Sequence, residues 1–284
     1  LREWDFYSSQ RLDYIIANSN FTSKRIQKYW GLKSEVIHPP VDIKRFNYRK
    51  SRGDFYISVN RLVPNKRIDL LIKAFNKLNL PLIIIGDGPE RLKLKKISNS
   101  NIKFLRKISD KEVENYMSRC KAFVYAGIED FGIAPVEAMA SGAPVIAYGK
   151  GGILDTVNCL NEKNTSEFKN GLLFKKQTSQ DIFDTISWFE DKKIWRKFDP
   201  NVLNVQKSNV LDPFQSLCQS NTMPAQLILG KDTNVLNIEQ ASKHWASMFN
   251  QTNIEVMSGY HHLMLDDPKK LFELIDTFIE GTHG

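Results

Sequence analysis

The sequence predicts an α/β fold, in which a doubly wound parallel sheet of the Rossmann-like kind is followed by a smaller α/β tail. Between residues 54 and 148, short apolar segments alternate regularly with longer amphipathic ones. The short segments are apolar at nearly every position, which is typical of parallel strands that helices cover on both faces. Polar and glycine-containing turns follow several of them, and such sheets bind ligands outside the carboxyl ends of their strands.

The residues before this region form a first strand and helix. Residues 12–18 (LDYIIAN) are expected to be a short buried strand, and the next helix is expected to begin near Ser19 or Thr22. Residues 35–46 (EVIHPPVDIKRF) contain a strand broken by two prolines, because proline cannot donate to a strand ladder. We interpret this break as a hinge into a new domain.

The central alternation defines the expected elements. Strands are expected at residues 54–60, 81–86, 102–107, 122–127, 143–148 and 171–174. Helices are expected at 68–78, 90–97, 109–120, 134–142 and 181–198. After residue 200 the pattern changes, and a strand, helix, strand and helix are expected at 224–230, 238–249, 253–257 and 268–280.

The charge is unevenly distributed along a chain of globular composition. The 284 residues are 42% hydrophobic and carry a formal net charge of +8. Residues 1–200 hold 35 lysines and arginines against 23 acidic residues, whereas residues 201–284 hold 5 against 9. A basic region of this kind binds nucleic acid, an anionic membrane face or phosphorylated metabolites, or is simply a solvated lysine-rich surface.

Cysteine usage and hydropathy place the chain in a broad class. Cys120, Cys159 and Cys218 are widely spaced and odd in number, which favours neither a disulfide framework nor a metal cluster. No apolar run approaches the roughly 20 residues that cross a bilayer, and the first ten residues lack a signal-peptide layout. We therefore expect a cytoplasmic protein with no metal site.

Two turns after predicted strands carry candidate ligand-binding residues. Arg61 and Lys66 flank a Pro-Asn turn, so both cations could converge on one diphosphate, although an ordinary exposed turn would look the same. The turn GDGPE begins at Gly86 and starts a helix. It lacks the three-glycine spacing of a dinucleotide fingerprint, so a tight strand-to-helix turn is the alternative.

A third turn, EDFGIAPVE, gives the most specific signal. Gly132 allows close backbone approach, and the amides of Ile133 and Ala134 are expected at a helix N-terminus, where unpaired N–H groups favour phosphate. Glu129 precedes the turn and Glu137 follows it, so one carboxylate can accept from ribose hydroxyls while the other faces a sugar. Glu137 could also be an exposed helix residue, but a carboxylate within the apolar VEAMA segment is unusual.

Together these segments resemble the C-terminal, donor-binding domain of the retaining, family-4 type of GT-B glycosyltransferases, in its mannosyltransferase-like branch. The resemblance covers roughly residues 1–200, from IANSNFTSKRI and VIHPPVD through SVNRLVPNKRID to EDFGIAPVEAMASGAPVIAYGKGG. It implies that Arg61 and Lys66 hold the donor diphosphate and that Glu137 holds the ribose. Glu129 would contact the transferred sugar as the catalytic residue.

The resemblance also implies the remaining donor contacts and the domain organisation. The turn formed by Phe131, Gly132, Ile133 and Ala134 would line the sugar and phosphate pocket, and Lys107 and Ile108 would flank the base. Residues 1–47 would be the remnant of an N-terminal GT-B domain with its hinge, and residues 48–200 the donor-binding domain. By this resemblance, most of the first domain, which would carry the acceptor site, is expected to lie outside the given sequence.

The same resemblance suggests substrates and location. The expected donor is a nucleotide sugar, with GDP-mannose preferred, and the acceptor is a glycan or a lipid-linked glycan in polysaccharide biosynthesis. No resident cofactor and no nucleic-acid partner are expected, and the protein could associate peripherally with the inner membrane face. Two departures affect the base region: Arg106 stands where the family often has glycine, and an insertion lengthens the loop at residues 161–170.

Residues 201–284 resemble the end of an α/β-hydrolase. Asp232 would be the triad acid and His261 the base, but the Gly-x-Ser-x-Gly nucleophile elbow is absent from the sequence. We interpret this segment as a hydrolase-like fragment joined to a glycosyltransferase fragment, and the charge reversal near residue 200 supports a junction. Three hypotheses follow: a glycosyltransferase, a hydrolase fragment without its nucleophile, or a non-catalytic nucleotide-sugar-binding module.

Overall fold

The computed structural model describes most of the first 193 residues and parts of the tail. The described residues are 2–42, 45–47, 49, 52–106, 108–159, 169–193, 225–230, 239, 252–258 and 268–282. The chain divides into two compact units, Leu1–Val210 and Leu211–Gly284.

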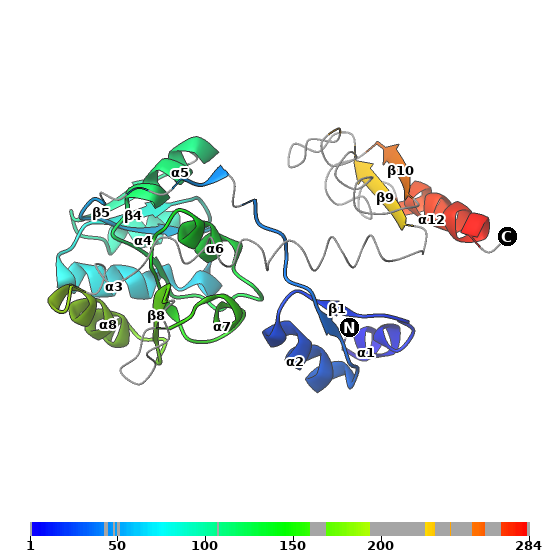
Figure 1. Ribbon diagram of the computed structural model, residues 1–284, viewed down its shortest axis with the longest axis horizontal. Coiled ribbons are helices and arrows are strands. Elements are labelled where there is room, and N and C mark those ends of the chain that lie inside the picture. Colours follow the sequence, from blue (N-terminus) through cyan, green and yellow to red (C-terminus); the bar gives the residue numbers. More distant parts are fainter. Residues whose placement is uncertain are drawn as a thin grey trace. The chain divides into compact units, whose positions relative to one another are not determined.

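A six-stranded parallel sheet forms the centre of the first unit (Figure 1). Its strands are β3 (Tyr56–Val59), β4 (Leu82–Ile85), β5 (Ile102–Leu105), β6 (Ala122–Tyr125), β7 (Val145–Tyr148) and β8 (Gly171–Phe174). Their order across the sheet is β5-β4-β3-β6-β7-β8, and every neighbouring pair is parallel. This arrangement confirms the predicted Rossmann-like α/β fold.

Helices cover both faces of this sheet, as the apolar strands require. They are η2 (Pro64–Lys66), α3 (Ile68–Leu78), α4 (Arg91–Lys96), α5 (Asp110–Arg119), α6 (Ile133–Ala140), α7 (Ile153–Thr156) and α8 (Ser179–Asp191). Neighbouring strand residues belong to different cores: Tyr56 packs in the cluster of α3 and α8, whereas Ile57 packs in the cluster of α5 and α6. Because both faces are buried, alternation of polar and apolar residues is lost along each strand.

Side-chain caps mark where several helices begin. Ser109 and Glu112 form a capping box at α5, and the hydroxyl of Thr178 accepts from the Asp181 amide at α8. These contacts satisfy amide groups that the helix itself leaves unpaired.

The first 40 residues form a small α/β segment of the same unit. Its elements are α1 (Arg2–Ser9), β1 (Ile16–Ala17), α2 (Asn20–Trp30) and β2 (Glu35–Val36). The two short strands pair in parallel, and Ser19 is the N-cap of α2. The expected strand at residues 12–18 is therefore only two residues long. Helix α1 was not expected.

The second unit contains a parallel strand pair and a helix. Strand β9 (Ala225–Gly230) pairs along its whole length with β10 (Thr252–Met257), and α12 spans Pro268–Thr282. The predicted hydrolase-like residues Asp232 and His261 lie outside the described residues, as does nearly all of the helix expected at 238–249. No helix within the described ranges combines the length and apolarity needed to cross a membrane.

Candidate functional site

Two cavities adjoin at the point where the strand order of the central sheet reverses. Strands β3 and β6 are neighbours there, but their chain connections lead to opposite edges, which is where doubly wound sheets bind ligands. One cavity of about 400 Å³ is lined by residues of the 129–135 turn, and we call it the turn cavity. The other, of about 450 Å³, is lined by Ile85, Gly86, Asp87 and Ile108, and we call it the loop cavity. Val59, Asn60 and Arg61 line both.

The turn cavity brings together predicted residues from two separate loops. Lys66 and Glu129 both line it, and their side chains form an ion pair. The hydroxyl of Tyr125 donates a hydrogen bond to the same carboxylate oxygen of Glu129. Burial, followed by this contact, raises the pKa of Tyr125 far above its usual range, so the phenol stays protonated and remains a donor. Glu129 is thus held by a cation and a neutral donor.

Arg61 is the second cation of the turn cavity and differs from Lys66 in its surroundings. It follows β3, is exposed, and lines both cavities. Within the part of the chain that the structure describes, its side chain makes no hydrogen bond or ion pair. An unpaired guanidinium beside a cavity can bind an anion without first breaking an internal contact.

Unpaired backbone amides of α6 add a further anion-binding feature to the same cavity. Gly132 is the N-cap residue, with φ of 95°, and no side chain caps the helix. Gly132, Ile133 and Ala134 line the cavity, and Phe131 packs beside them with only 4% of its surface exposed. The unpaired amides and the helix dipole favour a negatively charged group at this end of α6.

Gly151 and Gly152 follow β7, and Gly152 contacts the backbone of the 129–131 turn, a role that sequence reasoning missed. The amide of Gly152 donates to the carbonyl oxygen of Glu129 at 2.8 Å. A Cβ at position 152 would lie 2.0 Å from the carbonyl oxygen of Asp130. Only glycine allows this close approach, so Gly152 helps to determine where the backbone of Glu129 lies.

Gly86 has a comparable packing role beside the loop cavity. Its φ is 140°, and a Cβ there would lie 1.9 Å from the carbonyl oxygen of Asn60. The next residue, Asp87, pairs with Arg106 at 2.7 Å. The Arg106 contact and the Gly88 amide lower the pKa of Asp87. Lys107, the other residue expected at the base, lies outside the described residues.

Glu137 lies on α6 but lines neither of the two cavities. Burial raises its pKa, with Asp110 and Glu114 adding to the effect and the cation of Arg45 opposing it. Arg45 itself pairs with Glu114 at 2.8 Å. The structure therefore places Glu137 among charged groups of α5 rather than beside Glu129.

The N-terminal segment contributes residues that the sequence analysis did not select. Asn18 and Pro39 line the turn cavity, and Arg25 of α2 pairs with Asp130 at 2.7 Å. Pro39 belongs to the VIHPP stretch, which the sequence indicates as a hinge and as part of the family resemblance, without a predicted contact to the ligand. Its position shortly after β2 is the signal that could have placed it at a strand end, where ligands bind.

A metal centre is not evident at either cavity. Among the residues that the structure describes, no group of three or more histidine, cysteine, aspartate or glutamate side chains is arranged to hold a metal ion.

Solved structures share the fold of this chain. A structure of Anabaena Alr3699/HepE in complex with UDP and glucose aligns with a TM-score of 0.58 over 74% of this chain and 66% of that one, at 21% sequence identity. The structure of TarM aligns with a TM-score of 0.55 over 74% of this chain and 45% of that one, at 19% identity.

Curated relatives are more similar in sequence. The alpha-1,3/1,6-mannosyltransferase ALG2 of Saccharomyces cerevisiae is 30% identical over 207 residues, covering 53% of this chain and 41% of that protein. An uncharacterized glycosyltransferase of Methanocaldococcus jannaschii is 30% identical over 185 residues, covering 63% and 50%. The mouse GDP-Man:Man(3)GlcNAc(2)-PP-Dol alpha-1,2-mannosyltransferase is 29% identical over 170 residues, covering 49% and 35%. The chain thus spans half or less of the length of these relatives.

A family model gives the most direct assignment. Residues 41–201 match the model described as "Glycosyl transferases group 1". This range contains β3 to β8 and every residue of the two cavities except Asn18 and Pro39. Because it also covers more than half of the 284 residues, the chain belongs to the group 1 glycosyl transferases.

Proposed function

We propose that this chain provides the donor-binding half of a retaining glycosyltransferase, which moves a hexose from a nucleotide diphosphate sugar to a glycan or lipid-linked acceptor. The observation that carries the proposal is the convergence of Arg61, Lys66, Glu129 and the α6 amides on one cavity at the switch point of the sheet. Two cations, free amides and one carboxylate suit a ligand with a diphosphate at one end and a sugar at the other.

The diphosphate would lie where the two cations and the α6 amides meet. Arg61 supplies a planar donor whose side chain has no partner among the described residues, and Lys66 would exchange its contact with Glu129 for a phosphate oxygen. As the bond to the sugar breaks, negative charge grows on the departing nucleoside diphosphate. Positive groups that are already in place stabilise that charge with little reorganisation.

Glu129 would then be released from Lys66 and face the sugar. Its carboxylate can accept from sugar hydroxyls and stabilise positive charge that develops on the ring. In this proposal the retaining stereochemistry and the role of Glu137 at the ribose rest on the family resemblance alone. The loop cavity, with Gly86 and Ile108, would take the base, and Lys107 would lie beside it.

GDP-mannose is the proposed donor. The names of two relatives support it: the mouse enzyme is a GDP-Man-dependent mannosyltransferase, and a Corynebacterium glutamicum relative is a GDP-mannose-dependent mannosyltransferase of a phosphatidylinositol mannoside. The lipid-linked acceptors in the same names support a lipid-linked acceptor and peripheral association with the inner membrane face. The UDP of the Anabaena structure makes UDP-sugars the donors to compare.

A second candidate function is nucleotide-sugar binding without turnover. Arg61, Lys66 and the α6 amides, which line the turn cavity, would serve binding of the donor equally well in such a module. The hypothesis of a hydrolase-like fragment at residues 201–284 rests on sequence resemblance alone. The order β9, β10, α12 is compatible with it.

Calorimetric titration of the full chain with GDP, GDP-mannose, UDP and UDP-glucose tests the proposal. Binding of one nucleotide and its sugar conjugate is the expected result. Transfer to a lipid-linked acceptor, followed by anomeric analysis of the product, separates the enzyme from the binding module. A folded chain that binds none of the four ligands would exclude both the glycosyltransferase and the nucleotide-sugar-binding module.

A further inference from the structure

The turn cavity has a wall that lies outside the matched family region. Asn18 and Pro39 line it, and both precede residue 41, where the family match begins. Asn18 directly follows β1, and Pro39 lies shortly after β2. The carboxyl ends of β1 and β2 therefore lie at the same cavity as those of β3 and β6.

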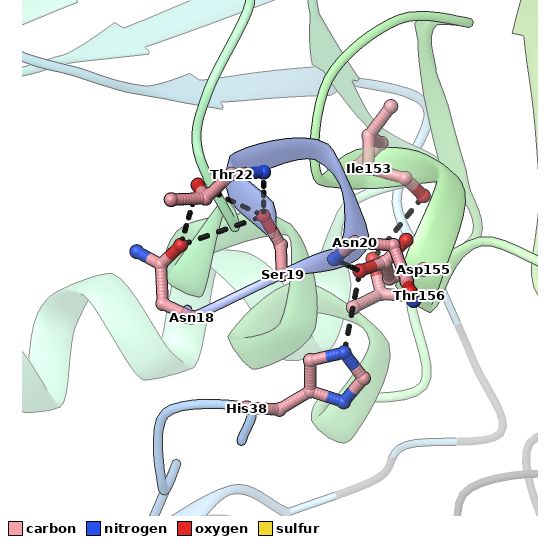
Figure 2. Close-up of polar contacts among 8 residues, drawn as sticks. All are labelled: Asn18, Ser19, Asn20, Thr22, His38, Ile153, Asp155 and Thr156. Carbon is pink, nitrogen blue, oxygen red and sulfur yellow. Dashed lines mark hydrogen bonds and ion pairs between the residues drawn. The ribbon is translucent and has the colours of Figure 1, made fainter. Parts of the chain in front are cut away.

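The side chain of Asn18 is oriented by its neighbours (Figure 2). Its carbonyl oxygen accepts from the Thr22 hydroxyl at 2.8 Å and from the Ser19 hydroxyl at 3.4 Å. The amide nitrogen of Asn18 is turned away from these hydroxyls and has no partner among the residues that the structure describes. Since hydroxyl donors occupy the carbonyl, the free NH2 group is the part of Asn18 that can serve a ligand.

Asp155 attaches this wall to the rest of the site. Its carboxylate accepts from the backbone amide of Asn20 at 2.6 Å, in the first turn of α2. The same oxygen lies 3.3 Å from Nε2 of His38. The Asp155 side chain is only 8% exposed, which strengthens both contacts because little water competes for the carboxylate. Figure 2 shows Asn20 and His38 reaching Asp155 of α7 from two directions.

His38 extends the attachment to the turn itself. Its ring stacks on Phe131 with centroids 5.3 Å apart and an interplanar angle of 28°. Phe131 lines the cavity, and Arg25 pairs with the adjacent Asp130. The segment that carries Asn18 is therefore held to the 129–131 turn at Asp130 and at Phe131.

We propose that Asn18 is a ligand-binding residue of the turn cavity and donates its amide N–H groups to an oxygen of the bound nucleotide sugar. His38 and Asp155 are positioning residues, because they hold the Asn18 wall against the turn that carries Glu129. This inference rests on the proposed function, which names the ligand. The acceptor oxygen belongs either to the diphosphate or to the sugar, and both are present in the same molecule.

Titrations of the full chain with GDP and GDP-mannose, or with UDP and UDP-glucose if the wild type prefers uridine, test the role of Asn18. Asn18→Ala is expected to weaken GDP-mannose binding about threefold to tenfold, the usual worth of one hydrogen bond. An equal loss for GDP assigns the contact to the diphosphate, and a loss for GDP-mannose alone assigns it to the sugar. Gln27→Ala, which removes an exposed amide side chain of α2 in the same segment, is the control and should bind like the wild type.

A double-mutant cycle tests the positioning role. If His38 holds the wall in place, Asn18→Ala should have little further effect on GDP-mannose binding in a His38→Ala background. Additive effects of the two changes would overturn the positioning role, because a merely structural His38 would leave the Asn18 contact intact. If His38→Ala is incompletely folded by circular dichroism, the cycle is run with His38→Phe, which keeps a ring against Phe131 but cannot donate to Asp155.

These measurements distinguish failure of the proposed function from failure of the Asn18 assignment. A wild-type chain that binds no nucleotide removes the proposed function. A wild-type chain that binds GDP-mannose, together with an Asn18→Ala variant of unchanged affinity for both ligands, overturns the assignment of Asn18 alone.

Discussion

Lys66 and Glu129 lie 63 residues apart in the sequence, yet their side chains form an ion pair in the wall of the turn cavity. The Lys66 side chain is 19% exposed and that of Glu129 is 26% exposed, so water screens the pair only in part. The pair also occupies the cation that would otherwise be free for a phosphate. Ligand binding and the internal ion pair therefore compete for the same ammonium group.

Glu129→Gln should strengthen the binding of a nucleoside diphosphate while abolishing sugar transfer. The neutral side chain no longer competes for Lys66, so we expect GDP or UDP to bind about threefold to tenfold more tightly. Calorimetry measures the affinity, and an acceptor assay measures transfer. Asp184→Asn, which removes an exposed carboxylate of α8, is the control and should change neither. Weaker diphosphate binding by Glu129→Gln would contradict this competition.

Arg61→Ala should weaken nucleotide binding by about tenfold or more, because the variant loses a charge-assisted contact and releases no side-chain partner in the described part of the chain. Arg61→Lys should recover only part of the loss, since a single ammonium cannot form a two-pronged contact. Titrations at two salt concentrations should show a smaller salt dependence for Arg61→Ala than for the wild type. Lys73→Ala removes an exposed cation from α3 and serves as the charge-matched control. Equal losses in Arg61→Ala and Lys73→Ala would mean that only overall charge matters.

Glu137 should make the stability of the fold depend on pH. Burial raises its pKa in the folded state, so Glu137 favours folding below its ordinary range near 4.5, and this contribution is lost as pH rises through the folded-state pKa. At neutral pH the buried charge of Glu137 destabilises the folded state. Glu137→Gln should therefore raise the midpoint of thermal unfolding by roughly 1–3 °C. The gain should shrink as pH falls toward 4. Glu3→Gln, an exposed change in α1, should show no such trend. A gain that stays constant across this pH range would show that burial of the charge is not its cause.

Gly152→Ala should destabilise the first unit through steric conflict alone. The backbone of Gly152 has φ of −65°, which alanine adopts readily, but the new methyl group would lie 2.0 Å from the Asp130 carbonyl oxygen. We expect a loss of about 1–3 kcal/mol in unfolding free energy and weaker ligand binding, because the turn must move. Gly31→Ala gives the complementary case: φ is 72° and nothing lies within 4 Å, so only about 1–2 kcal/mol of backbone strain is expected, with ligand binding unchanged. Chemical denaturation and calorimetry distinguish the two, and unaltered binding by Gly152→Ala would show that the turn does not depend on this contact.

Much of the fold follows from local sequence patterns. The apolar runs around Tyr56 and Phe123 predict parallel strands, because both faces of those strands are buried by helices. The turn residues after them were expected at the ligand edge for the same reason. The expected strand at residues 12–18 was too long, since only Ile16 and Ala17 pair with β2.

Local patterns in the sequence predict the succession of strands and helices, and they put Arg61, Lys66 and Glu129 on loops at strand ends, because periodicity and turn residues act over short stretches of chain. Three pairings are visible only in the folded chain: Lys66 meets Glu129, Glu137 lies among charged groups of α5, and His38 reaches Asp155 across 117 residues of sequence. These pairings depend on the order of strands in the sheet and on close backbone contacts such as that of Gly152 with Asp130. The strand order and these backbone contacts are set by packing between segments that are far apart in the sequence, and no local pattern encodes that packing.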